Sequence, residues 1–199
     1  AIGNQNSLGY LELVKANPGV DPWLPGDGTR ITVPRHYVLP DVKREGIIIN
    51  LAEYRLYYFT DGKVQVYPVG VGTDDNPSPL TNAEVTMPLV SHGCFRMYNE
   101  DISRFVYEVS KGTPVQVIHE PVKIGLKGNE VWLEVHRPEE DYSQQDREQL
   151  WKQVQQKVED FRQKMPGVEV KRMAIELAVD QADGLPRMVG ERLTRVADD

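Results

Sequence analysis

Hydrophobic residues change their spacing along the chain, and the middle part has the spacing of β-strands. Between Gly46 and His136 they form short runs or alternate with polar residues, as half-buried or buried strands do. Strands are expected at residues 46–51, 55–59, 63–70, 114–119 and 130–136. Thr60-Asp61-Gly62-Lys63 is a strong hairpin signal, because glycine accepts the positive φ of a tight turn. A mainly β domain, sandwich-like or barrel-like, is therefore expected at residues 37–137.

One helix is expected inside this β-rich part, after residue 98. Asn99, Glu100 and Asp101 suit a helix start, since their side chains can accept from free N–H groups and favour the positive end of the dipole. Asn99 is expected to cap this helix rather than bind a ligand. Apolar residues follow at helical spacing, and Lys111-Gly112 ends the pattern: they are Ile102, Phe105, Val106 and Val109.

The two flanks of the β-rich part have a different texture. Residues 1–36 predict a small module: a helix stopped at Asn17-Pro18-Gly19, a turn-rich stretch and a short strand at 29–33. Residues 138–199 predict a helical C-terminal subdomain, with a long amphipathic helix over 139–164 and a second helix near 168–182. The fold class is therefore α+β overall, a mainly β domain with one helix and a helical appendage.

Charge and composition exclude some functions. The chain has a net charge of −7 and a pI of about 5.2, which argues against a nucleic-acid phosphate backbone as the main partner. No apolar run approaches the length of a membrane span, and the first residues are not a signal peptide. If the protein is exported, we expect its signal to have been removed. No metal-ligand spacing occurs among its four histidines.

The candidate chemistry lies around the single cysteine, in Ser91-His92-Gly93-Cys94-Phe95-Arg96-Met97. A thiolate is a strong nucleophile, and a nearby imidazole and guanidinium favour that ionised form. On an extended segment, alternate residues face the same way, so His92, Cys94 and Arg96 could share one face. Gly93 leaves room for a substrate, and backbone N–H groups near Cys94 could bind an oxyanion.

A buried structural cysteine beside a chance histidine is the alternative interpretation. The close array of His92, Gly93, Cys94 and Arg96 favours catalysis over it. Arg96 could hold a substrate carboxylate or could equally pin the loop that follows, and the sequence leaves both open.

These residues also resemble a known family. The string around Cys94, followed by Asn99-Glu100-Asp101-Ile102, is similar to the signature of L,D-transpeptidase catalytic domains, and so is the upstream hairpin with Asn50-Leu51, Arg55-Leu56-Tyr57 and Tyr67-Pro68-Val69-Gly70. The likeness covers residues 46 to about 136. The N-terminal module resembles, more weakly, the second half of a lysin-motif (LysM) glycan-binding module. The order of lysin motif, catalytic domain and helical tail resembles that of the Gram-negative periplasmic branch of this family.

The resemblance implies an activity. Cys94 would attack the carbonyl after meso-diaminopimelate in a peptidoglycan tetrapeptide stem, and an amine would then take the acyl group. Ser91 and Arg96 would contact substrate, and His92 and Gly93 would complete the catalytic set. The acceptor would be another stem peptide or the lysine of an outer-membrane lipoprotein. A periplasmic location and acylation by carbapenems are further implications of the resemblance. The implied mechanism needs neither a metal nor an organic cofactor.

The chain departs from the family in one region. The family's general base is usually a histidine somewhat before the cysteine string, yet no histidine occurs between His36 and His92. Residues 73–83 are also too short for the family's lid. Either these 199 residues omit an internal segment, or the chain has a true deletion and is inactive. We favour the first explanation, because active-site lids are mobile by necessity. A mobile segment is easily lost through disorder or processing. The true base would then lie outside this chain, and His92 would only shape the site.

Two other functions compete with a transferase. One is a peptidoglycan-binding protein with a degenerate catalytic domain, which the missing histidine favours. The other is a cysteine amidase or peptidase that hydrolyses the same bonds, and Cys94 would serve it equally well.

Overall fold

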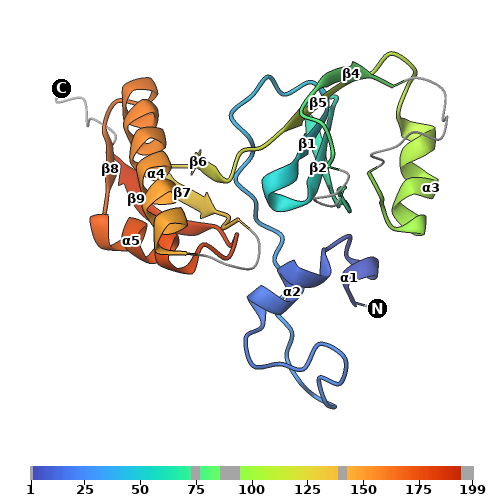
Figure 1. Cartoon of the computed structure of the whole chain (residues 1–199), viewed down its shortest axis with the longest axis horizontal. Coiled ribbons are helices and arrows are strands. Elements are labelled where there is room, and N and C mark those ends of the chain that lie inside the picture. The colour runs from blue at the N-terminus through green and yellow to red at the C-terminus, as the bar shows by residue number, and fades with distance from the viewer. Residues whose placement is uncertain (1, 73–76, 86–94, 139–142, 194–199) are drawn as a thin grey trace, which may run out of the picture. The chain divides into compact units, whose positions relative to one another are not determined.

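The computed structural model describes residues 2–72, 77–85, 95–138 and 143–193 (Figure 1). The chain forms two compact units. Unit 1 comprises Ala1–Val33 and Val42–Glu120, and unit 2 comprises Pro34–Asp41 and Pro121–Asp199. Within the described residues the fold is α+β, with nine strands in two sheets and five α-helices. No helix in this part of the chain is long and apolar enough to cross a membrane.

Unit 1 is built around a sheet in the order β3-β2-β1-β5-β4. Strand β1 pairs in parallel with β5, and the other neighbours are antiparallel. The strands are β1 (Gly46–Asn50), β2 (Arg55–Thr60), β3 (Lys63–Pro68), β4 (Asn82–Glu84) and β5 (Pro114–Ile118). The strands expected at 46–51, 55–59, 63–70 and 114–119 are confirmed to within two residues, while β4 was not expected.

The turn between β2 and β3 is the predicted hairpin. Thr60 pairs with Lys63, so only Asp61 and Gly62 form the loop. Both have positive φ, 49° and 71°, as a type I′ turn requires. This tight turn fixes the register of the two strands that lead toward the candidate site.

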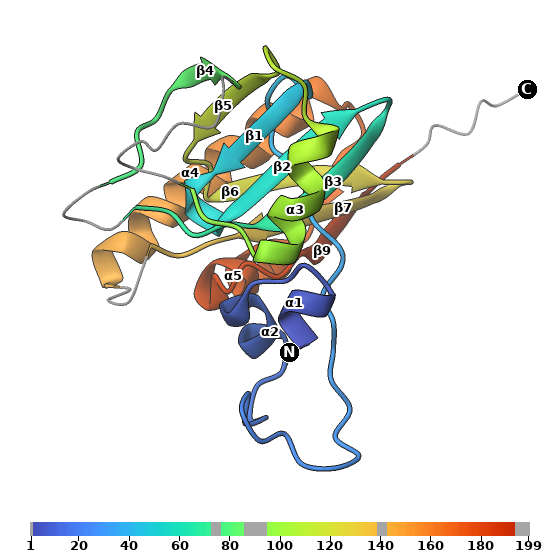
Figure 2. The same ribbon diagram turned by 90° about the vertical axis from the view of Figure 1, so that its right-hand side faces the viewer.

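Helix α3 (Asn99–Glu108) lies against one face of this sheet (Figure 2). Its buried Phe105 meets the rings of Tyr58 and Tyr67 edge to face, each at a centroid distance of 5.4 Å. The expected cap was wrong, because Asn99 is the first helical residue and Tyr98 is the N-cap. The Tyr98 side chain makes no capping hydrogen bond to the first turn. Extended backbone at Tyr98 is enough to start the helix here.

The N-terminal part of unit 1 contains the short helices α1 (Ile2–Gln5) and α2 (Tyr10–Ala16). Helix α2 ends at Asn17, as predicted. The side chain of Asn17 then bridges the turn-rich stretch, because its amide donates to Thr32 O at 2.8 Å and its oxygen accepts from Thr32 N at 2.6 Å. The strand expected at 29–33 was wrong, since these residues pair with no strand.

Unit 2 has a four-stranded antiparallel sheet in the order β6-β7-β9-β8. Two helices, α4 (Gln144–Lys164) and α5 (Arg172–Gln181), pack on it (Figure 1). The C-terminal part is therefore not helical alone, because β8 and β9 complete its sheet. The strands are β6 (Val122–Lys127), β7 (Glu130–Val135), β8 (Val168–Val170) and β9 (Arg187–Arg192).

The long helix α4 has the predicted apolar face. Leu150, Val154 and Val158 are buried and join a core with Leu133 and Val189. A capping box formed by Ser143 and Asp146 begins the helix, satisfying N–H groups that the first turn leaves free. Amphipathic spacing thus predicted α4 correctly, and its apolar face covers the sheet of unit 2.

Candidate active site

The cysteine string lies partly outside the described residues. Ser91, His92, Gly93 and Cys94 are not described, so their catalytic and binding roles stay predictions. The chain is described again from Phe95. What the structure supplies is the frame on either side of this segment, and all of that frame belongs to unit 1.

The residues directly after Cys94 are attached to the sheet of unit 1. Phe95 and Met97 pack against a core that includes Val69 and Leu56. Between them, Arg96 forms an antiparallel bridge with Gly70, which follows β3. Gly70 N–H donates to Arg96 O at 2.8 Å, and Arg96 N–H donates to Gly70 O at 3.0 Å. The chain next to Cys94 is thus held through both its side chains and its backbone.

Arg96 was expected either to bind a substrate carboxylate or to pin the following loop. Its backbone makes the pinning bonds with Gly70, whereas the residue as a whole is exposed to solvent. The guanidinium is therefore not needed for the pinning and remains a candidate for substrate binding.

The segment before the cysteine string lies at the edge of the same sheet. Thr81 O accepts from Val117 N–H at 2.8 Å, and β4 pairs with β5 from Asn82 to Glu84. On the other side of residues 73–76, Ser78 is buried and its hydroxyl accepts from Gly72 N–H at 2.9 Å. Both described flanks of residues 73–76 therefore belong to unit 1. The sequence around these residues is too short for the family's lid.

A buried polar network lies within unit 1 and was missed by the sequence reasoning. The Glu53 carboxylate accepts from Arg55 Nη1 at 2.7 Å, Tyr57 OH at 2.9 Å and Asn50 Nδ2 at 2.6 Å. Buried charge is stable only where it is paired and hydrogen-bonded, and these contacts meet that condition. The sequence contained one signal for this network, because the polar residues Asn50 and Arg55 pair directly across β1 and β2.

The histidines outside the cysteine string lie in both units. In unit 1 the only described histidine is His119, which is exposed and follows β5. His36 is exposed and belongs to unit 2. His92 and Cys94 lie outside the described residues, so their pairing stays a prediction.

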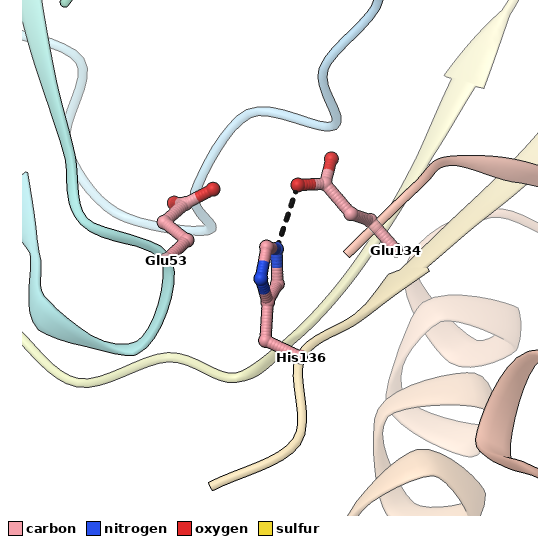
Figure 3. A group of neighbouring side chains, drawn as sticks. All are labelled: Glu53, Glu134 and His136. Atoms are coloured by element: carbon pink, nitrogen blue, oxygen red, sulfur yellow. Dashed lines mark hydrogen bonds and ion pairs between the residues drawn. The ribbon is translucent and has the colours of Figure 1, made fainter. Parts of the chain in front are cut away.

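His136, also in unit 2, has a structural partner instead. Its Nε2 lies 2.8 Å from Glu134 Oε1 (Figure 3), which also accepts from Lys123 Nζ at 3.0 Å. Glu134 Oε2 accepts from Val38 N–H at 2.7 Å. These contacts explain the position of His136 as part of a buried network around the Glu134 carboxylate.

Comparison with known proteins finds relatives that are named as probable L,D-transpeptidases. No family model matches it. It is 31% identical to "Probable L,D-transpeptidase YcfS" of Escherichia coli, over 69% of this chain and 64% of that protein. It is 33% identical to "Probable L,D-transpeptidase ErfK/SrfK" of Salmonella typhimurium, over 65% and 62%. With "Probable L,D-transpeptidase YbiS" of Escherichia coli it shares 33% identity, over 66% and 63%.

The chain belongs to the L,D-transpeptidase family, as the resemblance around Cys94 had predicted. It spans somewhat less than two thirds of the length of these relatives.

Proposed function

We propose that this protein is an L,D-transpeptidase that acts on peptidoglycan stem peptides through a covalent intermediate on Cys94. The observation that carries the proposal is the similarity to relatives named as probable L,D-transpeptidases, at 31–33% identity over about two thirds of the chain. Cys94 is the only cysteine in the sequence. Any thiol chemistry of this chain must therefore use it.

The described geometry supports an ordered site. Acyl transfer requires a nucleophile held close to the carbonyl, since small misplacements lower the rate steeply. Phe95 and Met97 are packed in a core, and Arg96 is bound to Gly70 by two backbone hydrogen bonds. A chain anchored at the residue next to Cys94 suits a nucleophile better than a loosely tethered thiol would.

The proposed reaction has two steps. The Cys94 thiolate attacks the carbonyl that follows meso-diaminopimelate in a tetrapeptide stem, forming a thioester and expelling D-alanine, whose amine takes up a proton. An acceptor amine then attacks the thioester, forming a new amide and releasing the thiolate, while the amine's proton passes to a base. Backbone N–H groups near Gly93 would stabilise the oxyanion of each tetrahedral intermediate. The base for these proton transfers would lie in the family segment that these 199 residues lack, and His92 would shape the site.

The acceptor is either a second stem peptide or the terminal lysine of an outer-membrane lipoprotein. Both acceptors supply a primary amine. An enzyme that uses either of them would work in the periplasm. A lysin-motif-like N-terminal module would add affinity for the glycan strand. Carbapenems carry a strained acyl group and would acylate the same thiol.

Intact-protein mass spectrometry with a carbapenem tests the nucleophile. The wild-type protein should gain the mass of one carbapenem, and Cys94→Ala should gain none. Incubation with tetrapeptide muropeptides, with and without an acceptor amine, then tests the reaction. Cross-linked or amine-capped product is expected. Hydrolysed product alone, with acceptor present, would reject transfer in favour of a cysteine amidase or peptidase.

A peptidoglycan-binding protein with a degenerate catalytic domain is the second candidate. The absence of any histidine between His36 and His92 favours it. It predicts retention of the protein on insoluble peptidoglycan together with an unmodified Cys94 after carbapenem treatment. Acylated Cys94 would reject it.

A further inference from the structure

The first residues of the chain contact the first turn of the helix that follows Cys94. Ser7 Oγ donates to Asp101 Oδ1 at 2.8 Å, and Tyr98 OH donates to Leu8 O at 3.2 Å. A third contact joins Asn4 to Glu100, whose carboxyl pKa is lowered first by its own backbone N–H and then by the Asn4 side chain. Residues 4–8 thus meet residues 98–101 at three neighbouring points.

This contact is buried, which is unusual for a helix start. Asp101 is only 4% exposed and Leu8 only 1%. An acidic residue in the first turn of a helix normally faces solvent, where it interacts with the dipole at little cost. Asp101 Oδ2 is buried without a hydrogen-bond partner among the described residues. The Ser7 hydroxyl is therefore an important compensation for burying this carboxylate.

A second attachment lies on the neighbouring helix α2. Glu12 Oε1 lies 2.8 Å from Arg55 Nη2, and the two side chains are only 13% and 5% exposed. Arg55 is the first residue of β2 and also binds Glu53. Residues 2–16 are thus fastened to the sheet of unit 1 as well as to α3, and they form part of this unit rather than a module on a free tether.

We infer that residues 4–12 act as a clamp on residues 98–101, with Ser7 and Tyr98 as positioning residues for the chain that follows Cys94. The inference rests on the proposed function. Tyr98 is four residues after Cys94 in the chain, and Arg96 lies between them. Gly70 holds the backbone at Arg96, and the clamp holds it at Tyr98 and Asp101. The chain that follows Cys94 is therefore held at two places, first by Gly70 and then by the clamp.

Ser7→Ala and Tyr98→Phe each remove one hydroxyl from the clamp and leave the cysteine string unchanged. Matched controls exist on the same helix. Ser103→Ala removes an exposed hydroxyl that bonds only within the helix, and Tyr107→Phe alters a ring that is 90% exposed. Ser103 and Tyr107 have no contact with the clamp among the hydrogen bonds of the described residues.

Two measurements on the full chain decide the question. Hydrogen exchange of the peptide covering residues 95–101 reports how firmly the segment is held, and intact mass over time gives the maximal rate and half-saturation of carbapenem acylation. For each clamp variant we expect faster exchange in this peptide and an acylation rate lowered about three- to tenfold, the usual effect of one lost hydrogen bond. Half-saturation should stay unchanged, and both controls should match wild type.

Each other outcome overturns the inference. Unchanged exchange in Ser7→Ala and Tyr98→Phe would mean that the clamp does not hold the segment. Faster exchange with a wild-type acylation rate would mean that the contact is structural only. An acylated wild-type protein in either case would leave the proposed function standing. A wild-type protein that no carbapenem acylates would instead reject the proposed function, and the inference with it.

Discussion

Gly70 and Arg96 exchange two backbone hydrogen bonds, although 25 residues separate them in the sequence. The pair joins the chain leaving β3 to the residue two positions after Cys94. Because both bonds are made by the backbone, they would tolerate side-chain changes at either residue but not the loss of an N–H group.

Replacement of Gly70 by proline therefore tests this pair. Proline has no N–H to donate to Arg96 O, so Gly70→Pro should lower the free energy of unfolding by about 2 kcal/mol and slow acylation of Cys94. Gly70→Ala is the matched control. An added Cβ would lie 3.5 Å from Arg96 Cβ, an ordinary contact, so alanine should change both quantities little. Urea unfolding and carbapenem mass spectrometry measure them, and equal behaviour of the two variants would contradict the assigned role of the bridge.

The ion pair between Lys123 and Glu134 supports a second prediction, in unit 2. Both side chains are 0% exposed and the charged atoms lie 3.0 Å apart. Lys123→Met leaves a buried carboxylate without this cation, so it should lower the free energy of unfolding by about 3–5 kcal/mol. The double variant Lys123→Met with Glu134→Gln should lose less than the single one.

Lys164→Met supplies the control for this experiment. Lys164 pairs with Asp41 on the surface, with both side chains more than half exposed, and such pairs contribute about 0–1 kcal/mol. Urea titrations of the three variants and the wild-type protein give the comparison. A Lys123→Met protein as stable as Lys164→Met would show that burial has not made the inner pair essential.

Local patterns predicted the elements whose signals are contained in short windows. Asp61-Gly62 fixed the hairpin because both positions require positive φ, and Leu150, Val154 and Val158 predicted α4 because they share one helix face. Helix α3 was also predicted, although its cap was assigned one residue too late. In each case neighbouring residues carry the physical cause, so a single sequence is sufficient.

Pairings between distant segments could not be predicted in the same way. Strand β8 has only three residues, and it exists because it pairs with β9 about twenty residues later. The partners of Glu134 are equally remote, since Val38 lies 96 positions away. Cys94 was predicted as the nucleophile from residue types and family resemblance, and its role stays a prediction. The contact between Ser7 and Asp101 joins residues 94 positions apart, so neither local sequence indicates it.

Asp183 and Arg187 predict a pH dependence of stability in unit 2. Burial raises the pKa of the Asp183 carboxyl, but hydrogen bonds from Arg187 and from Leu185 N–H, with the Arg187 charge, outweigh it and lower the pKa overall. Two bonds of 2.7 Å join the guanidinium to the carboxylate. A group with a lowered pKa in the folded state contributes stability above its unfolded pKa, and the contribution is lost as pH falls through the folded value.

Asp183→Asn should therefore lower the free energy of unfolding by about 1 kcal/mol at neutral pH. The difference from wild type should shrink in acid, because the wild-type carboxylate then becomes protonated and loses its advantage. Asp180→Asn breaks a more exposed pair with Arg147 and should change little at any pH. Urea unfolding across an acidic to neutral series measures this, and a constant difference for Asp183→Asn would contradict the linkage.

Gly190 in β9 gives the last prediction, because another backbone approaches it very closely. A Cβ at this position would lie 2.0 Å from Glu169 O and 2.7 Å from Val170 Cα. Backbone atoms of the paired strand β8 cannot rotate away as a side chain would, so Gly190→Ala must push β8 off the sheet. We expect a loss of about 3 kcal/mol in the free energy of unfolding.

Gly128→Ala separates this steric effect from the general effect of adding a methyl group to a glycine. Gly128 lies in the turn between β6 and β7 with φ at 65°, and a Cβ added there would meet no other atom within 4 Å. Alanine at this position encounters only the backbone strain of a left-handed conformation, about 1 kcal/mol. Thermal and urea unfolding should therefore rank Gly190→Ala well below Gly128→Ala, since a sheet can relax less than a turn. The reverse order would mean that β8 is not held against β9 at Gly190.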